Sequence, residues 1–83
     1  MAYVTKTVLV GADWTTITSK IAMLQFNDEM HMAITNGGTP TDTVGFVMNI
    51  NEKYINSEDG IYVWAKTISG GSNIESVRVV ENG

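Results

Sequence analysis

The sequence predicts an all-β fold, a small antiparallel β-sandwich or a jelly-roll-like barrel of about seven or eight short strands. Two observations predict it. Short runs rich in valine, isoleucine, threonine and aromatic residues alternate between two side-chain faces, as strands with one buried face do. Clusters of glycine, asparagine, aspartate and serine separate these runs at intervals of about 8–12 residues.

The last third of the chain, residues 60–81, shows this pattern most clearly. Two apolar runs surround the turn sequence Ile-Ser-Gly-Gly-Ser-Asn, and we expect them to form a closing β-hairpin with a long loop. In the first run, alternation gives an inner set of Ile61, Val63 and Ala65 and an outer set of Tyr62, Trp64 and Lys66. In the second run, it places Val77 and Val79 on one face with Glu75 and Glu81.

The first half of the chain contains four candidate strands. The turn formers Asn27 and Asp28 separate the third from the fourth, so we expect a tight hairpin there. A helix over residues 20–34 is the competing interpretation, because alanine, methionine, leucine, glutamine and glutamate favour helices. The period-two alternation and the central Asn-Asp pair favour strands instead. The four candidates cover residues 4–10, 14–18, 21–26 and 30–35.

Loops and shorter strands make up the middle of the chain. Residues 36–42 form the clearest loop and contain the single proline. We expect a strand at 43–49, a turn with a small strand at 51–55, and a loop at 56–60. Three of the five methionines, Met30, Met32 and Met48, fall on expected core faces, where a flexible thioether side chain fills gaps.

Length and composition limit the function classes. At 83 residues, the chain predicts a single domain over 1–83, with 14–81 as the core sandwich and 1–12 as a possible docking arm or edge strand. It has no cysteine and one histidine, which excludes a disulfide framework, a thiolate zinc site and a multi-histidine metal site within one chain. Five scattered basic residues against nine acidic ones argue against nucleic-acid binding. No apolar run approaches the roughly 20 residues of a membrane helix.

Residues that could carry catalysis are sparse. The single histidine, His31, follows Asp28 and Glu29, but no further ligand or nucleophile has a spacing that would complete a site. The adjacent acids Asp28-Glu29 and Glu58-Asp59 lie in expected turns, where they are ordinarily solvated. We therefore expect a protein without enzymatic activity, cofactor or metal.

The balance of residue types predicts a partner. With 43% hydrophobic and only 17% charged residues, apolar surface should remain after a small core is filled. The first strand could pair with the edge of a neighbour. The large aromatics could anchor a protein interface or, less readily, stack on sugar rings, although Trp14 could simply cap the core. The candidate interface residues are Val4, Val8, Val10, Trp14, Tyr62 and Trp64.

An ordered set of motifs over residues 14–81 resembles a known group of proteins. The chain is similar to small β-sandwich structural proteins of tailed bacteriophage virions, which commonly close with a Val-Trp-Ala strand, a Gly/Ser turn and a terminal Val-x-Val strand. The motifs are Trp-Thr-Thr-Ile at 14–17, a strand–turn–strand at 21–35, a Gly/Thr/Pro loop at 37–42, Val-Gly-Phe-Val at 44–47, Asn-Glu-Lys-Tyr at 51–54, Gly-Ile-Tyr-Val-Trp-Ala-Lys at 60–66 and Val-Arg-Val-Val-Glu at 77–81.

The resemblance implies a structural role in the virion. Its members decorate or stabilise capsids, form head fibres, or belong to tails and adaptors, frequently as trimers or other oligomers. For this chain it implies the major capsid protein or other virion proteins as partners, with a trimer as the favoured homo-oligomer. A tail, adaptor or fibre-base component and a carbohydrate-binding module remain the alternatives.

Overall fold

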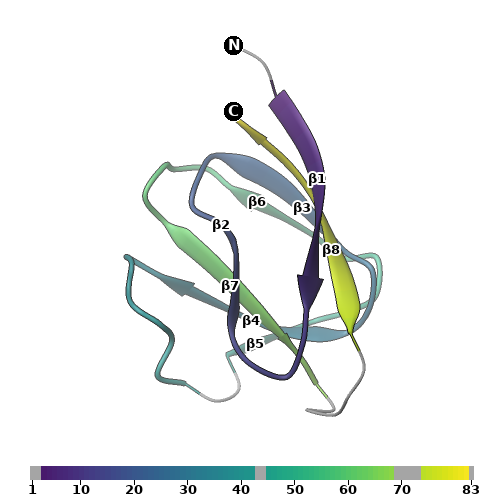
Figure 1. Ribbon diagram of the computed structural model, residues 1–83. Coiled ribbons are helices and arrows are strands. Elements are labelled where there is room, and N and C mark those ends of the chain that lie inside the picture. The colour runs from purple at the N-terminus through teal and green to yellow at the C-terminus, as the bar shows by residue number, and fades with distance from the viewer. Residues whose placement is uncertain (1–2, 43–44, 69–73, 83) are drawn as a thin grey trace.

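The computed structural model describes residues 3–42, 45–68 and 74–82, and in these ranges the chain consists of eight strands without a helix. The predicted all-β class is confirmed, and the competing helix over 20–34 is wrong. No described helix could cross a membrane. The strands are β1 (Tyr3–Val10), β2 (Thr15–Thr18), β3 (Ala22–Phe26), β4 (Met30–Thr35), β5 (Phe46–Met48), β6 (Lys53–Asn56), β7 (Tyr62–Thr67) and β8 (Glu75–Asn82) (Figure 1).

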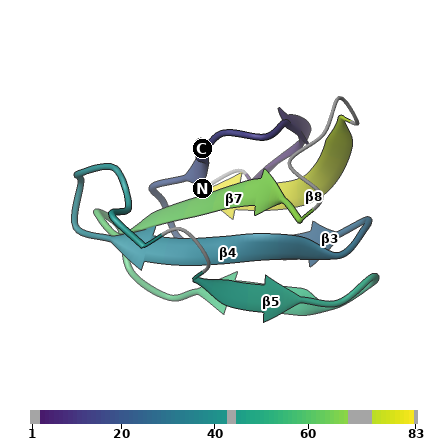
Figure 2. The same ribbon diagram turned by 90° about the horizontal axis from the view of Figure 1, so that it is seen from below.

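The strands form two four-stranded antiparallel sheets that pack face to face (Figures 1 and 2). Sheet A has the order β1-β8-β3-β6, and sheet B has the order β2-β7-β4-β5. Strands pair first with last: β1 with β8, β2 with β7, β3 with β6, and β4 with β5. The chain is thus one long antiparallel ribbon, bent back at the β4–β5 loop and rolled into two layers. This is the arrangement of an eight-stranded jelly roll.

Both hairpins predicted between consecutive strands are wrong. β3 and β4 lie in different sheets, and so do β7 and β8. The connection after β3 is an arch, in which the Asn27 amide still donates to the Ser76 carbonyl of sheet A while the Glu29 amide already donates to the Asp28 carboxylate. Alternation predicts which face of a strand is buried, but the same alternation occurs in strands joined by a hairpin and in strands joined by an arch. The turn residues are also compatible with either type of connection.

The core lies between the sheets and follows the predicted alternation. β3 buries Ala22, Leu24 and Phe26, and β7 buries Val63 and Ala65. The three methionines predicted for the core, Met30, Met32 and Met48, are all buried. Val77 and Val79 of β8 complete the same cluster with Val10 and Ile17.

A hydrogen-bonded seam closes one end of the sandwich. The buried side-chain amide of Asn56 donates to the carbonyls of Lys20, Glu58 and Ile61, at 2.8, 3.2 and 3.1 Å. The Gly60 amide donates to the Ser19 carbonyl at 2.9 Å. The β2–β3 and β6–β7 connections are therefore held side by side, and this seam fixes the edge of sheet A where β3 meets β6.

Candidate functional site

The first strand is integrated into sheet A. β1 pairs with β8 over its whole length, from Tyr3 opposite Asn82 to Val10 opposite Glu75, and its other edge carries no strand in the described structure. Of the candidate interface residues here, Val10 is fully buried, Val8 packs partly against the core, and Val4 is 48% exposed. The strand therefore offers its open edge and its outward side chains, which include Tyr3 and Leu9, whereas Val8 and Val10 face the sandwich interior.

The three candidate aromatics gather on the outer face of sheet B. Trp64 is opposite Thr16 on one side and Ala33 on the other. Its indole nitrogen donates to the Thr35 hydroxyl at 2.9 Å, and Tyr62 is the register partner of Thr35. All three rings are half-buried.

These aromatics fasten the β4–β5 loop to the sheet. The Trp14 indole nitrogen donates to the Asp42 carbonyl at 3.0 Å, and the Lys66 ammonium lies 4.6 Å from the centre of the Trp14 ring. Gly45 lies against the same tryptophan and against the Met32 carbonyl. Both indole N–H groups and one face of Trp14 are therefore used within the chain, which leaves less ring surface for stacking on a sugar.

A contiguous apolar surface lies elsewhere, on the outer face of sheet A. The strand register places Val80, Met23 and Ile55 side by side across β8, β3 and β6. Tyr3 and Ile21 extend this row at one end of the sheet, where the Asn82 amide donates to the Ile21 carbonyl. We call these five residues the sheet A patch. Tyr3, Ile21, Met23 and Ile55 are 65%, 37%, 57% and 65% exposed, respectively.

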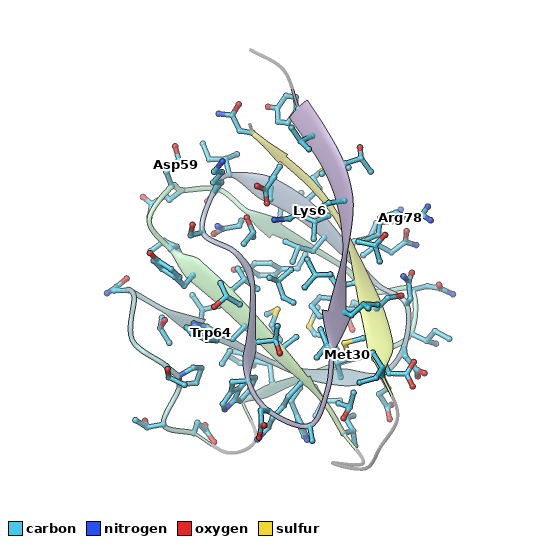
Figure 3. The ribbon with its side chains drawn as sticks, in the orientation of Figure 1. Lys6, Met30, Asp59, Trp64 and Arg78 are labelled. Atoms are coloured by element: carbon cyan, nitrogen blue, oxygen red, sulfur yellow. The ribbon has the colours of Figure 1, made fainter. Side chains whose placement is uncertain are left out.

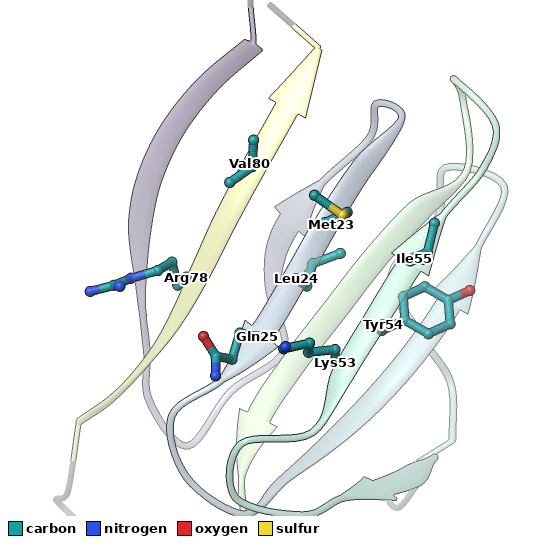
Figure 4. Close-up of a pocket in the computed structure, with 8 residues that line it drawn as sticks. All are labelled: Met23, Leu24, Gln25, Lys53, Tyr54, Ile55, Arg78 and Val80. Carbon is teal, nitrogen blue, oxygen red and sulfur yellow. The ribbon is translucent and has the colours of Figure 1, made fainter.

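Two adjoining depressions mark this patch, each with a volume of about 240 Å³. Met23, Ile55 and Val80 line both of them, and Figure 4 shows the three side chains in a row above Arg78, Gln25 and Lys53. Small-molecule pockets usually enclose about 300–1,000 Å³. Depressions of this size on an open sheet suit individual side chains of another protein.

A row of polar residues borders the patch. Arg78, Gln25 and Lys53 are register neighbours on β8, β3 and β6, one row away from Val80, Met23 and Ile55. Arg78 and Lys53 are exposed, and Figure 3 shows Arg78 pointing away from the body of the sandwich. Neither makes a salt bridge within the described residues. The other three cations are engaged, Lys6 and Lys20 with Glu81 and Lys66 with Trp14.

A carboxylate lies inside the sandwich at the same end as the seam. Glu81 is 9% exposed, accepts from the Thr18 hydroxyl at 3.1 Å, and lies 3.0 and 3.8 Å from the ammonium groups of Lys6 and Lys20. Burial opposes ionisation, but the hydrogen bonds from Lys6 and Thr18 and the charges of both lysines outweigh it. The pKa of Glu81 is therefore lowered. This cluster joins a buried carboxylate to two partly exposed lysines, and it stabilises the end of the sandwich.

The acidic residues at the opposite end form a pair. The hydrogen bond that protonated Glu75 donates to the neighbouring Asp28 carboxylate raises the pKa of Glu75, with smaller contributions from burial and from the Asp28 charge. The described residues contain no group of three or more histidine, cysteine, aspartate or glutamate side chains that could hold a metal ion. His31 lies on the outer face of sheet B opposite Lys66 and Val47.

Sequence reasoning missed the sheet A patch, although a signal was present. Residues 21–26 are apolar on both faces, with Ile21 and Met23 opposite the core residues Ala22 and Leu24. A strand that is apolar on both faces indicates a second buried or docking surface. Only the register shows that Ile55 and Val80, which are distant in sequence, join the same patch.

Comparison with known proteins returned no match: no protein family, no curated protein and no solved structure resembles this chain significantly.

Proposed function

We propose that this protein is a non-enzymatic structural protein of a tailed-bacteriophage virion, most simply a capsid decoration or stabilising protein. The observation that carries the proposal is the sheet A patch. Four of its side chains are 37–65% exposed although the domain has a complete core between its sheets. Contiguous apolar surface on a small domain is characteristic of an interaction site.

Two further points support the proposal. The ordered motifs of residues 14–81 resemble small virion sandwich proteins, and jelly rolls recur in viral capsid proteins as well as in lectins and cupins. One fold serves many functions, so the jelly roll supports a virion role only together with the motifs. Many copies on a regular particle would convert a weak single contact into firm attachment.

The open edge of β1 is the proposed contact between copies. It is eight residues long, and its one charged side chain, Lys6, is partly exposed and is neutralised by a salt bridge with Glu81. Edges that avoid pairing usually carry outward charges, proline or a bulge. A homo-oligomer, with a trimer favoured, would bury this edge.

The test is to purify particles from cells that carry the gene and to locate the protein on them. We expect mass spectrometry to detect the chain in mature particles, immunogold labelling to place it on heads, and sedimentation of the recombinant protein to give an oligomer. Label confined to tails would assign it to the tail or adaptor alternative. Its absence from every particle fraction would overturn the virion role.

A further inference from the structure

We propose that the outer face of sheet A docks a protein surface that is both apolar and acidic. The inference rests on the proposed function, which places the partner in the virion, and it specifies the chemistry of the partner's surface. The face combines the five-residue sheet A patch with the bordering row Arg78, Gln25 and Lys53. The apolar part calls for buried side chains on the partner, and the polar row sets the sign of its charge.

The distribution of charge selects an acidic partner. The chain carries a formal charge of −4, yet the two cations that have neither a salt bridge nor a cation–π contact in the described structure, Arg78 and Lys53, both lie on this one face. Arg78 and Lys53 are separated by one strand, so their backbones are about 10 Å apart. That spacing admits a separate carboxylate for each cation, with Gln25 able to donate or accept between them.

The same charges argue against a second copy bound by its own sheet A face. The residues of β1, β3, β6 and β8 that point outward from sheet A include no aspartate or glutamate. A symmetric face-to-face dimer would therefore bring Arg78 and Lys53 near their own copies without a counter-charge. Removing unpaired cations from water is costly, so such a dimer would be weak.

A membrane surface is also a poor fit. Association with anionic lipid gains about 1 kcal/mol per basic residue near the bilayer and usually requires a cluster of four or more. The sheet A face offers two cations on a protein of net negative charge. The two depressions, each about 240 Å³, instead suit discrete apolar side chains of a protein.

The experiment uses random 12-residue peptides displayed on filamentous phage, selected on the 83-residue protein. The probes of the face are the double variants Met23→Glu/Ile55→Glu and Arg78→Glu/Lys53→Glu. The matched control is Val47→Glu, which makes the same apolar-to-acid change at a position 50% exposed on sheet B, compared with 57% for Met23. Circular dichroism and urea titration verify that each variant is folded. The charge-reversal variant Arg78→Glu/Lys53→Glu alters only exposed side chains without salt bridges, so we expect it to fold. It therefore still tests the inference if Met23→Glu/Ile55→Glu does not fold.

We expect the enriched peptides to combine two or more acidic residues with leucine, isoleucine or phenylalanine. Their affinity should fall at least tenfold in both face variants, remain unchanged in Val47→Glu, and weaken with added salt. Peptides with lysine in place of the acids should bind the charge-reversal variant and not the wild type. This reciprocal exchange would not follow from mere loss of stability.

Several outcomes would overturn the inference: no enrichment, enrichment of peptides without acidic residues, or equal binding to wild type and face variants. Sedimentation with vesicles of phosphatidylglycerol and phosphatidylcholine, if the charge-reversal variant abolished it, would assign the face to a membrane. Self-association that is lost in the same variant would assign it to a second copy. Absence from virions combined with the expected selection would overturn the virion role alone, so the two failures are distinguishable.

Discussion

Two buried threonines with different surroundings separate packing from hydrogen bonding. Thr18 and Thr67 are each 3% exposed. The Thr18 hydroxyl donates to Glu81 and accepts from the Lys20 amide, whereas the Thr67 hydroxyl has no partner in the described structure. A buried hydroxyl without a partner loses its hydrogen bonds to water on folding and gains none within the protein, so it lowers the stability of the folded state.

We therefore expect Thr67→Val to raise the free energy of unfolding by about 1 kcal/mol, and Thr18→Val to lower it by about 1–3 kcal/mol. Urea titrations of both variants at neutral pH measure the difference. The two substitutions are chemically identical, so each is the control for the other. Equal effects of the same sign would contradict the assigned hydrogen bonds.

The ion pair at Glu81 gives stability a defined pH dependence. Its pKa in the folded protein is lowered from the ordinary value of 4.5, so the folded state binds fewer protons than the unfolded chain in acid. The stabilisation is complete above about pH 4.5 and is lost as the pH falls through the lowered pKa. Glu81→Gln should be less stable than the wild type by roughly 1–3 kcal/mol at pH 7.

Urea midpoints measured from pH 7 to pH 3 test this expectation. The deficit of Glu81→Gln should shrink as the pH falls below 4.5. Glu75 provides the contrast, because the neighbouring Asp28 raises its pKa, so this pair gains stability as the pH falls. Glu75→Gln should therefore be at least as stable as the wild type at pH 7. A deficit in Glu81→Gln that does not change with pH would contradict the ion-pair assignment.

At the scale of the strands, the sequence predicts which face is buried but not which strand is the neighbour. The core residues of β3 and β7 and the three buried methionines follow from period-two alternation. Partners depend on register between distant segments, such as Met23 with Val80, and on arches whose turn residues resemble those of hairpins. For the same reason Glu81 could be placed on the valine face, but its salt bridges with Lys6 and Lys20 could not be predicted.

Gly45 determines how β5 and the preceding loop attach to sheet B. Its φ of +61° lies in the left-handed region, and a Cβ there would clash with the Met32 carbonyl oxygen. We expect Gly45→Ala to cost at least about 2 kcal/mol of unfolding free energy, because backbone strain and a steric clash combine. Gly38→Ala, in the same loop with no atom within 4 Å of its Cβ, is the control. Similar losses in both variants would contradict this view of Gly45.

At the scale of the whole molecule, the sequence predicts that a candidate site exists but not where it lies. Composition predicted surplus apolar surface, and that surface is present. Its location was missed, because the aromatics that drew attention, Trp14 and Trp64, use their indole N–H groups within the chain. The patch is built from isolated apolar residues on three strands, and only the rolled ribbon brings them together.

The first-to-last pairing of the strands also bears on how the protein acquires its shape. Only β4 and β5 are joined through the bend of the ribbon, so theirs is the pairing with the shortest loop to close, and each further pair must enclose a longer segment. We expect folding to begin with the pairing of β4 and β5 at that bend and to end with the pairing of β1 and β8, over milliseconds to seconds. In stopped-flow measurements, Gly45→Ala should then slow refolding, whereas Val8→Ala, near the ribbon's free ends, should mainly hasten unfolding.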